Sequence, residues 1–283
     1  IGTNDDATIE GSAATGNVSA SGPAAGGLIG RTDVEPDQIP LTIRRCYAAG
    51  DIDNDGQATG GLIGENSGDK VVDSYALGDV TGQTDAGGLI GTNTEGFEVL
   101  NAERSGEDVT TASSDAEGGG IHRSYAAGAV TATDNDGAEG GLVGSNDSSI
   151  EQSYWDTETT GQPEAVDSPG NLPSSIKGLT TSEMQGVTPT NQGKGTMEAF
   201  NFERDGESKT AWFAVVEGEE INPTPAEDGY PILEGPDPAD QLSAQGIDEA
   251  ESPGFGDFEV VAITEATPTE AETEGEDADA QSG

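Results

Sequence analysis

The stretch Asp-Ile-Asp-Asn-Asp-Gly at residues 51–56 places acidic side chains at alternate positions and glycine at the sixth. This is how an EF-hand calcium loop begins, with carboxylate oxygens as ligands. The twelfth position is Leu62 instead of the required glutamate, and no helical pattern flanks the stretch. A similar turn, Asp-Asn-Asp-Gly, occupies residues 134–137. Asp, Asn and Gly also suit tight turns, so calcium binding and a plain turn both remain open. The candidate calcium ligands are Asp53, Asp55, Asp134 and Asp136.

The single histidine, His122, and the single cysteine, Cys46, limit nucleophilic and metal chemistry. A Ser–His pair would rest on His122 alone, and the sequence contains neither a Gly-x-Ser-x-Gly elbow nor a His-Glu-x-x-His pair. One cysteine allows no intrachain disulfide and no cysteine zinc site. With 55 acidic residues, neighbouring carboxylates arise by chance and say nothing about glycosidase chemistry. We predict that the chain is not an enzyme.

A repeated pattern must position these residues. Ser-Tyr-Ala-x-Gly-x-Val, followed by Gly-Gly-Leu-Ile-Gly, occurs in residues 73–93 and recurs in variants that begin at residues 12, 46 and 124, with a last start at 153. Tyr47 and Tyr75 lie 75 − 47 = 28 residues apart, and Tyr125 and Tyr154 lie 154 − 125 = 29 apart, but Tyr75 and Tyr125 lie 125 − 75 = 50 apart. The long interval predicts an insertion at residues 92–122, which would leave the array as a surface loop.

Each repeat holds two short apolar segments bounded by glycine, a pattern that predicts β-strands. If equivalent positions stack, their side chains form ladders that bury the core one rung at a time. The predicted ladders are Tyr47, Tyr75, Tyr125 and Tyr154, then Ile52, Val80 and Val130, then Leu28, Leu62, Leu89 and Leu142. Cys46 takes the position of Ser74, Ser124 and Ser153 in the sister repeats, so we expect it to be a buried substitute for serine.

These repeats resemble the GLUG-motif repeats of filamentous-haemagglutinin-like surface proteins, adhesins and some bacterial IgA-peptidase passenger regions. The resemblance covers roughly residues 12–233 and extends to the ending, with Ser-Tyr-Trp-Asp at 153–156, Gly-Leu-Thr-Thr at 178–181 and Tyr-Pro-Ile-Leu at 230–233. It implies a right-handed parallel β-helix, an all-β solenoid of about five rungs. It carries no catalytic residues.

The resemblance also implies an extracellular, cell-surface protein that acts in adhesion or structural display. Surface glycans or other cell-surface proteins would be its partners. The alternative is the repeat region of a secreted carbohydrate-active or peptidase β-helix protein. Two N-glycosylation sequons, at Asn17 and Asn146, would suit secretion, although so short a motif also arises by chance.

Three regions follow from this pattern. Residues 1–152 would form the solenoid, and residues 153–233, which hold both tryptophans, would cap its open sheet edge and include a helical turn at 180–184. Residues 234–283 read as an acidic linker and tail with one candidate strand at 255–263. Because residue 1 falls inside a repeat, we expect the chain to be a piece of a longer protein.

The charge restricts the environment and the partners. Fifty-five acidic residues face ten basic ones, for a formal net charge of -45. Such a charge strains a compact fold by self-repulsion, which molar salt removes by shortening the screening length to about 3 Å. The pattern resembles proteins of extreme halophiles such as haloarchaea; the alternative is a mesophilic acidic protein with disordered segments. Nucleic acids are disfavoured as partners because they need a basic footprint, and no apolar run is long enough to insert into a membrane.

Overall fold

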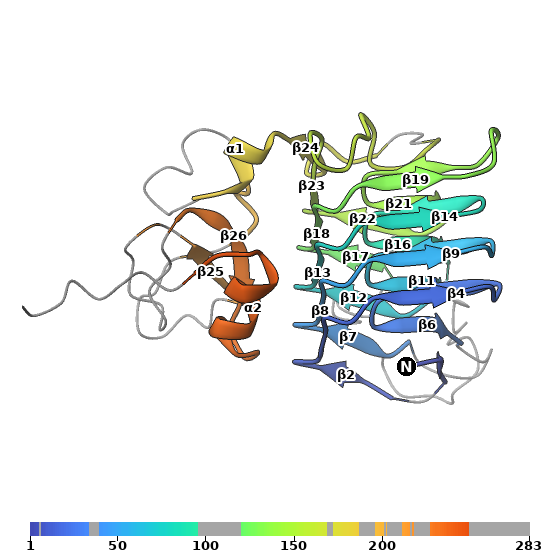
Figure 1. Cartoon of the computed structure of the whole chain (residues 1–283), viewed down its shortest axis with the longest axis horizontal. Helices are drawn as coiled ribbons and strands as arrows, with labels where there is room; N and C mark the ends of the chain where they lie inside the picture. The colour runs from blue at the N-terminus through green and yellow to red at the C-terminus, as the bar shows by residue number, and fades with distance from the viewer. Residues whose placement is uncertain are drawn as a thin grey trace, which may run out of the picture. The chain divides into compact units, whose positions relative to one another are not determined.

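A computed structural model describes residues 1–5, 7–33, 40–95, 120–168, 172–186, 196–200, 202, 211–215, 217 and 227–248. Within these ranges the chain is mostly β-strand, with two short helices. Strands from successive repeats pair in parallel, and Figure 1 shows them stacked one above another. The predicted all-β class with a parallel, solenoid-like arrangement is therefore confirmed.

Five parallel sheets run along the solenoid, and the chain visits them in the same order in each coil. Sheet 1 contains β2 (Ile9–Glu10), β7 (Thr42–Arg44), β12 (Lys70–Val72), β17 (Gly120–His122) and β22 (Ser149–Glu151). Sheet 2 contains β3 (Ala13–Ala14), β8 (Tyr47–Ala48), β13 (Tyr75–Ala76), β18 (Tyr125–Ala126), β23 (Tyr154–Asp156) and β24 (Lys177–Leu179).

The other three sheets complete each coil. Sheet 3 contains β4 (Val18–Ala20), β9 (Ile52–Asn54), β14 (Val80–Gly82) and β19 (Val130–Ala132). Sheet 4 contains β5 (Ala24–Gly26), β10 (Ala58–Gly60), β15 (Asp85–Gly87) and β20 (Glu139–Gly140). Sheet 5 contains β1 (Thr3–Asn4), β6 (Ile29–Thr32), β11 (Ile63–Ser67), β16 (Ile90–Thr94) and β21 (Val143–Asn146). We number the coils from β2, so β7 begins the second, β12 the third, β17 the fourth and β22 the fifth.

The sequence repeats coincide with the coils. Tyr75 pairs with Tyr47 on one side and with Tyr125 on the other, and Val80 pairs likewise with Ile52 and Val130. Equivalent residues therefore lie one above another throughout the stack. The inner core holds the leucine positions together with isoleucine and valine from sheets 1 and 5; its members include Ile43, Leu62, Val71, Leu89, Ile90, Ile121, Leu142 and Val143.

The last glycine of Gly-Gly-Leu-Ile-Gly brings sheets 4 and 5 close together. A Cβ atom at Gly91 would lie 2.3 Å from the backbone nitrogen of Thr59 and 2.6 Å from the carbonyl oxygen of Gly64. Gly64 and Gly144 are equally crowded by the backbone of sheet 4. Because only glycine lacks a Cβ, it alone allows this approach between two backbones.

The tyrosine column lies on the outward face of sheet 2. Ala48, Ala76 and Ala126, which follow the tyrosines, belong to the inner core, so the tyrosines point the other way. The rings of Tyr47 and Tyr75 stack with centroids 5.1 Å apart, and those of Tyr75 and Tyr125 at 4.9 Å. The column is nevertheless buried, and burial raises the pKa values of Tyr75 and Tyr125 well above the ordinary value.

Two different segments cover the solenoid. The described residues from 154 to 179 close its last coil: the Leu142 N–H donates to the Ala165 carbonyl, the Gly141 N–H donates to the Glu164 carbonyl, and β24 pairs with β23. The rest, which we call the lateral segment, comprises the described residues from 181 to 248. It contains α1 (Thr181–Met184), β25 (Trp212–Val215), β26 (Gly229–Leu233) and α2 (Pro238–Ala244).

The lateral segment packs against the tyrosine column and not only against the end of the stack. Its residues Met184, Phe200 and Trp212 share one apolar cluster with the tyrosines. The Tyr75 hydroxyl donates to Gln241 Oε1 at 3.0 Å, and the Tyr125 hydroxyl donates to the carbonyl of Pro231 at 2.8 Å. We expected residues 153–233 to cap the end of the array; the described residues of this range after 180 also contact the side of the stack.

Helix α2 lies within the region that we interpreted as an acidic linker and tail. Asp237 caps it by accepting a hydrogen bond from the Ala239 N–H at 2.9 Å, and Pro238 opens its first turn. Gln241 and Leu242 are buried. The helical turn predicted at 180–184 is confirmed as α1, where Glu183 accepts a hydrogen bond from the Thr180 N–H. The candidate strand at 255–263 and most of the 92–122 insertion lie outside the described residues.

Candidate functional site

The corner between sheets 1 and 2 is built from residues in an unusual backbone conformation. Arg45, Asp73, Arg123 and Gln152, which we call the corner column, have φ values of 53°, 47°, 44° and 50°. Left-handed φ is uncommon outside glycine and costs energy. Backbone hydrogen bonds to the next coil hold it: the Arg45 N–H donates to Val72 O and the Asp73 N–H to His122 O. The second to fifth coils thus each present one side chain at the same corner.

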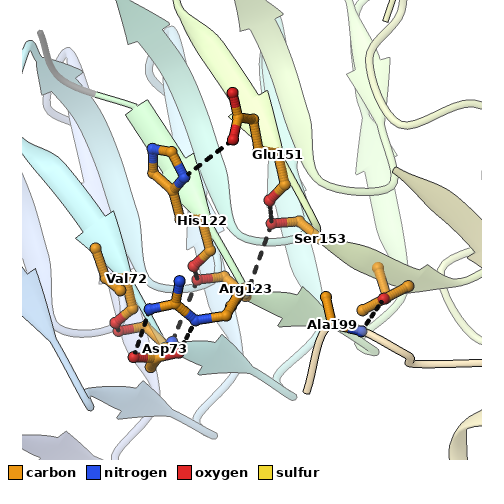
Figure 2. A network of polar contacts seen from close by, with 10 residues as sticks. Val72, Asp73, His122, Arg123, Glu151, Ser153 and Ala199 are labelled. Carbon is orange, nitrogen blue, oxygen red and sulfur yellow. Dashed lines mark hydrogen bonds and ion pairs between the residues drawn. The ribbon is translucent and has the colours of Figure 1, made fainter. Parts of the chain in front are cut away.

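Ion pairs link neighbouring coils at this corner (Figure 2). Arg123 donates from Nε to Asp73 Oδ1 at 2.8 Å and from Nη2 to Oδ2 at 3.1 Å, a bidentate pair that is partly buried. His122 Nδ1 lies 3.6 Å from a carboxylate oxygen of Glu151. Burial, and then the nearby Lys70 ammonium, lower the pKa of His122. The imidazole is therefore mostly neutral at pH 7, and its contact with Glu151 is weaker than a full salt bridge.

The outward face of sheet 1 and its corner gather most of the described cations. Arg44, Arg45, Lys70 and Arg123, which we call the cation face, are four of the six lysines and arginines among the described residues. Arg44 Nη2 lies 2.7 Å from a carboxylate oxygen of Glu10, and Arg123 pairs with Asp73. Within the described part of the chain, no ion pair involves Arg45 or Lys70.

The opposite charge dominates sheet 3 and the turns that flank it. The coil stretches 11–30, 46–69, 74–95 and 124–152 contain no lysine or arginine. Six exposed aspartates, which we call the acidic side, lie there in the second, third and fourth coils: Asp51, Asp53, Asp55, Asp79, Asp134 and Asp136. The acidic side therefore lacks described cations, whereas sheet 1 and its corner carry cations together with Glu10, Asp73 and Glu151.

The calcium candidates belong to the acidic side but are spread over separate coils. Asp53 and Asp55 lie in the second coil, and Asp134 and Asp136 in the fourth. The third coil separates them, because the Gln83 N–H donates to Gly56 O below it and the Asp134 N–H donates to Gln83 O above it. The two turns are therefore not neighbours that share one ion. Among the described residues no group of three His, Cys, Asp or Glu side chains is arranged to hold a metal.

The two sequon asparagines lie in different surroundings. Asn17 is exposed, and its Oδ1 accepts a hydrogen bond from the Asp51 N–H at 3.0 Å. Asn146 ends a column of side-chain amides within the solenoid: Asn66 Nδ2 donates to Asn93 Oδ1 at 2.8 Å, and Asn93 Nδ2 donates to Asn146 Oδ1 at 2.7 Å. Asn146 Nδ2 donates in turn to Ser148 O. The glycosylation nitrogen of Asn146 is therefore already engaged, whereas no hydrogen bond of Asn17 Nδ2 occurs within the described residues.

Cys46 continues a column of serines, as the repeats predict. The Cys46 N–H donates to Ser74 Oγ, and the Ser74 N–H donates to Ser124 Oγ, each at 3.2 Å. The Cys46 thiol contacts the Arg44 carbonyl in the way that the Ser74 hydroxyl contacts Val72. Burial raises the pKa of this thiol to about 11, so Cys46 is protonated and inert near neutral pH.

A cavity of about 400 Å³ lies between the tyrosine side of sheet 2 and the lateral segment. Thr159, Thr181, Asp228 and Gln245 contribute polar groups to its lining, and Leu77 contributes an apolar wall. Beside it, the Tyr230 hydroxyl donates to Asp156 Oδ2 at 2.6 Å, which joins the lateral segment to the fifth coil. Burial, and then that carboxylate, raise the pKa of Tyr230. The pair is consequently a structural contact rather than a proton donor at neutral pH.

Comparison of the chain with protein-family models, curated proteins and solved structures gave no match. Neither of the helices in the described residues has the length and apolar character needed to cross a lipid bilayer.

Sequence reasoning missed the corner column and the cation face. Arg45, Asp73, Arg123 and Gln152 each precede the Ser or Cys of a repeat, so their common position was visible. Their four residue types have nothing in common that would indicate a left-handed backbone. Glycine would have indicated it, but only the first coil has glycine at this corner, where Gly11 has φ 59°.

Proposed function

We propose that the chain is a non-catalytic adhesion or structural display module of an extracellular, cell-surface protein. It is a right-handed β-helix of about five coils, and it is adapted to high salt. One observation supports this proposal: the side chains of the repeated residues are already engaged in contacts between coils. Tyrosine, asparagine, serine and glycine positions each bond to, or pack on, their equivalents above and below. Recognition is then left to the residues that differ between coils and face outward.

The outward faces offer two surfaces for recognition. One is the cation face and corner column, where side-chain identity changes from coil to coil while the backbone stays fixed. The other is the region of the 92–122 insertion, whose described ends are Thr94 in β16 and Gly120 in β17. The insertion therefore leaves sheet 5 and returns to the start of sheet 1, beside Lys70, which pairs with Gly120. Surface glycans or other cell-surface proteins are the proposed partners.

A glycan panel incubated with the protein in multimolar KCl tests this proposal. We expect glycans to be bound and then recovered at unchanged length. Release of reducing ends or of unsaturated products would instead establish the alternative, a carbohydrate-active β-helix.

A further inference from the structure

Each of the three central coils carries at least one cation on the cation face, where the third coil also contributes Asp73, and carries only carboxylates among its charged groups on the acidic side. The second coil has Arg44 and Arg45 on the cation face and Asp51, Asp53 and Asp55 on the acidic side. The third coil has Lys70 and Asp79, and the fourth has Arg123 with Asp134 and Asp136. No described lysine or arginine interrupts the acidic side in these coils.

Both charged columns advance with the same period, because both follow the stacking of the coils. Neighbouring strands in a sheet are about 4.8 Å apart, so charges in successive coils rise by that distance on either side of the molecule. A second copy of the chain, placed alongside at the same height, would therefore set cations opposite carboxylates in coil after coil. A globular partner has no reason to match this period, whereas another copy matches it by construction.

The groups needed for such a contact are free to form it. Arg45 and Lys70 make no ion pair within the described residues, and Asp53, Asp55, Asp134 and Asp136 are exposed and make none there either. Glu10 and Asp73 occupy Arg44 and Arg123 only in part, since both arginines keep outward donors. Arg45 shares the left-handed backbone of Asp73 and Arg123, so the corner presents these three side chains from equivalent backbone positions.

We propose that the cation face of one copy docks against the acidic side of a second copy, with the two solenoid axes parallel. The two contact surfaces lie on different parts of the same molecule, so the contact is heterologous. Each added copy leaves one cation face and one acidic side unpaired, so association continues beyond a dimer, in an open row or in a closed ring according to the angle between the two faces. This inference goes beyond the display function proposed above, and either can hold without the other.

Raising the salt concentration should promote this association. A net charge of -45 on every copy repels other copies at low ionic strength. At molar salt the screening length falls to about 3 Å, so the long-range repulsion disappears while charges in direct contact still interact. Association should therefore appear as the salt concentration rises, opposite to the behaviour of a simple ion-pair interface.

Sedimentation velocity in multimolar KCl tests the proposal with two charge-reversed variants. The first carries Arg45→Glu and the second carries Asp53→Lys, both in the second coil; neither side chain makes an ion pair within the described residues. We expect the wild-type chain to associate in a concentration-dependent series, and each variant alone to associate at least roughly tenfold more weakly because like charges then face each other. Mixing the two variants should restore association, since each then offers the other an oppositely charged side.

Arg31→Glu is the control, because it makes the same charge change as Arg45→Glu but on sheet 5, away from both surfaces; it also removes the contacts of Arg31 with Asp33 and Glu65. It should associate like the wild type, and far-UV circular dichroism should show that all variants keep the β signal. A wild-type chain that stays monomeric, or association that survives both reversals, would overturn the proposal, as would failure of the mixture to associate. A monomeric chain that binds an anionic polysaccharide such as alginate through Lys70 would assign the cation face to a glycan instead.

Discussion

At the scale of single residues, the amide column shows how polar groups specify the stack. Asn93 is fully buried, and it accepts from Asn66 below and donates to Asn146 above. Thr32 continues the column downward by donating to Asn66 Oδ1 at 2.9 Å. A coil that slipped by one residue would leave these buried amides without partners, which is costly. The column therefore fixes the register between coils, which the apolar ladders alone would not determine uniquely.

We predict that Asn93→Ala lowers the free energy of unfolding by about 2–4 kcal/mol, because it removes a hydrogen-bond partner from the buried amide of Asn66 and from the partly buried amide of Asn146. Urea unfolding in multimolar KCl measures this change. Asn135→Ala is the matched control, since Asn135 is exposed in the turn of the fourth coil, and it should change stability by less than about 0.5 kcal/mol. Equal effects of the two substitutions would show that the column contributes nothing.

A second residue-scale prediction concerns the thiol of Cys46. Its pKa is raised from 9.0 to about 11. At a given pH below 9 the folded chain therefore holds roughly a hundredfold less thiolate than the unfolded chain. Because the folded form keeps the proton, this group stabilises the fold fully below pH 9 and loses that contribution as the pH rises towards 11. Iodoacetamide labelling at pH 8, followed by mass spectrometry, should be fast in urea and slow without it; similar rates would contradict burial of the thiol.

The sequence predicted these residues unevenly. Repetition alone identified the tyrosine and leucine positions, because stacking makes equivalent residues meet. Asn66, Asn93 and Asn146 were equally regular, each two residues after the last glycine of its repeat, but asparagine suits exposed turns as well as buried columns. Burial decides between the two interpretations, and burial of a single polar position depends on how sheet 5 passes into sheet 1.

At the scale of elements, the approach of sheets 4 and 5 depends on glycine. We predict that Gly91→Ala destabilises the fold by about 1–3 kcal/mol or more, because its Cβ would meet backbone on both sides and neither sheet can move without disturbing its neighbours. Thermal unfolding followed by circular dichroism measures this effect. Gly16→Ala is the control, since a Cβ there has no heavy atom within 4 Å. A neutral result at Gly91 would mean that the two sheets separate more readily than their close contact implies.

The position of the lateral segment could not be predicted from the sequence. Its components were visible, with aromatic residues after position 150 and a capped turn at 180–184. Its position was not, because Gln241 and Pro231 bind tyrosines 166 and 106 residues away and belong to no repeat. Helix α2 carried a local signal in Asp237 and Pro238, which the acidic composition of the surrounding stretch obscured.

At the scale of the whole molecule, charge sets the conditions under which the fold persists. We predict that dialysis from multimolar KCl to low salt abolishes the β signal in far-UV circular dichroism, because a net charge of -45 is then no longer screened. Sucrose at matched osmolarity is the control, since it changes water activity without screening charge. A cooperative fold retained at low salt would refute adaptation to high salt.

The lateral segment also determines how the stack would carry tension. Gln241 joins the segment to Tyr75 in the third coil, Pro231 joins it to Tyr125 in the fourth, and Tyr230 joins it to Asp156 in the fifth. A pull applied beyond α2 therefore reaches three coils together instead of peeling the fifth away first. The segment reinforces the side of the solenoid. It distributes a mechanical load among three coils that would otherwise unfold one after another.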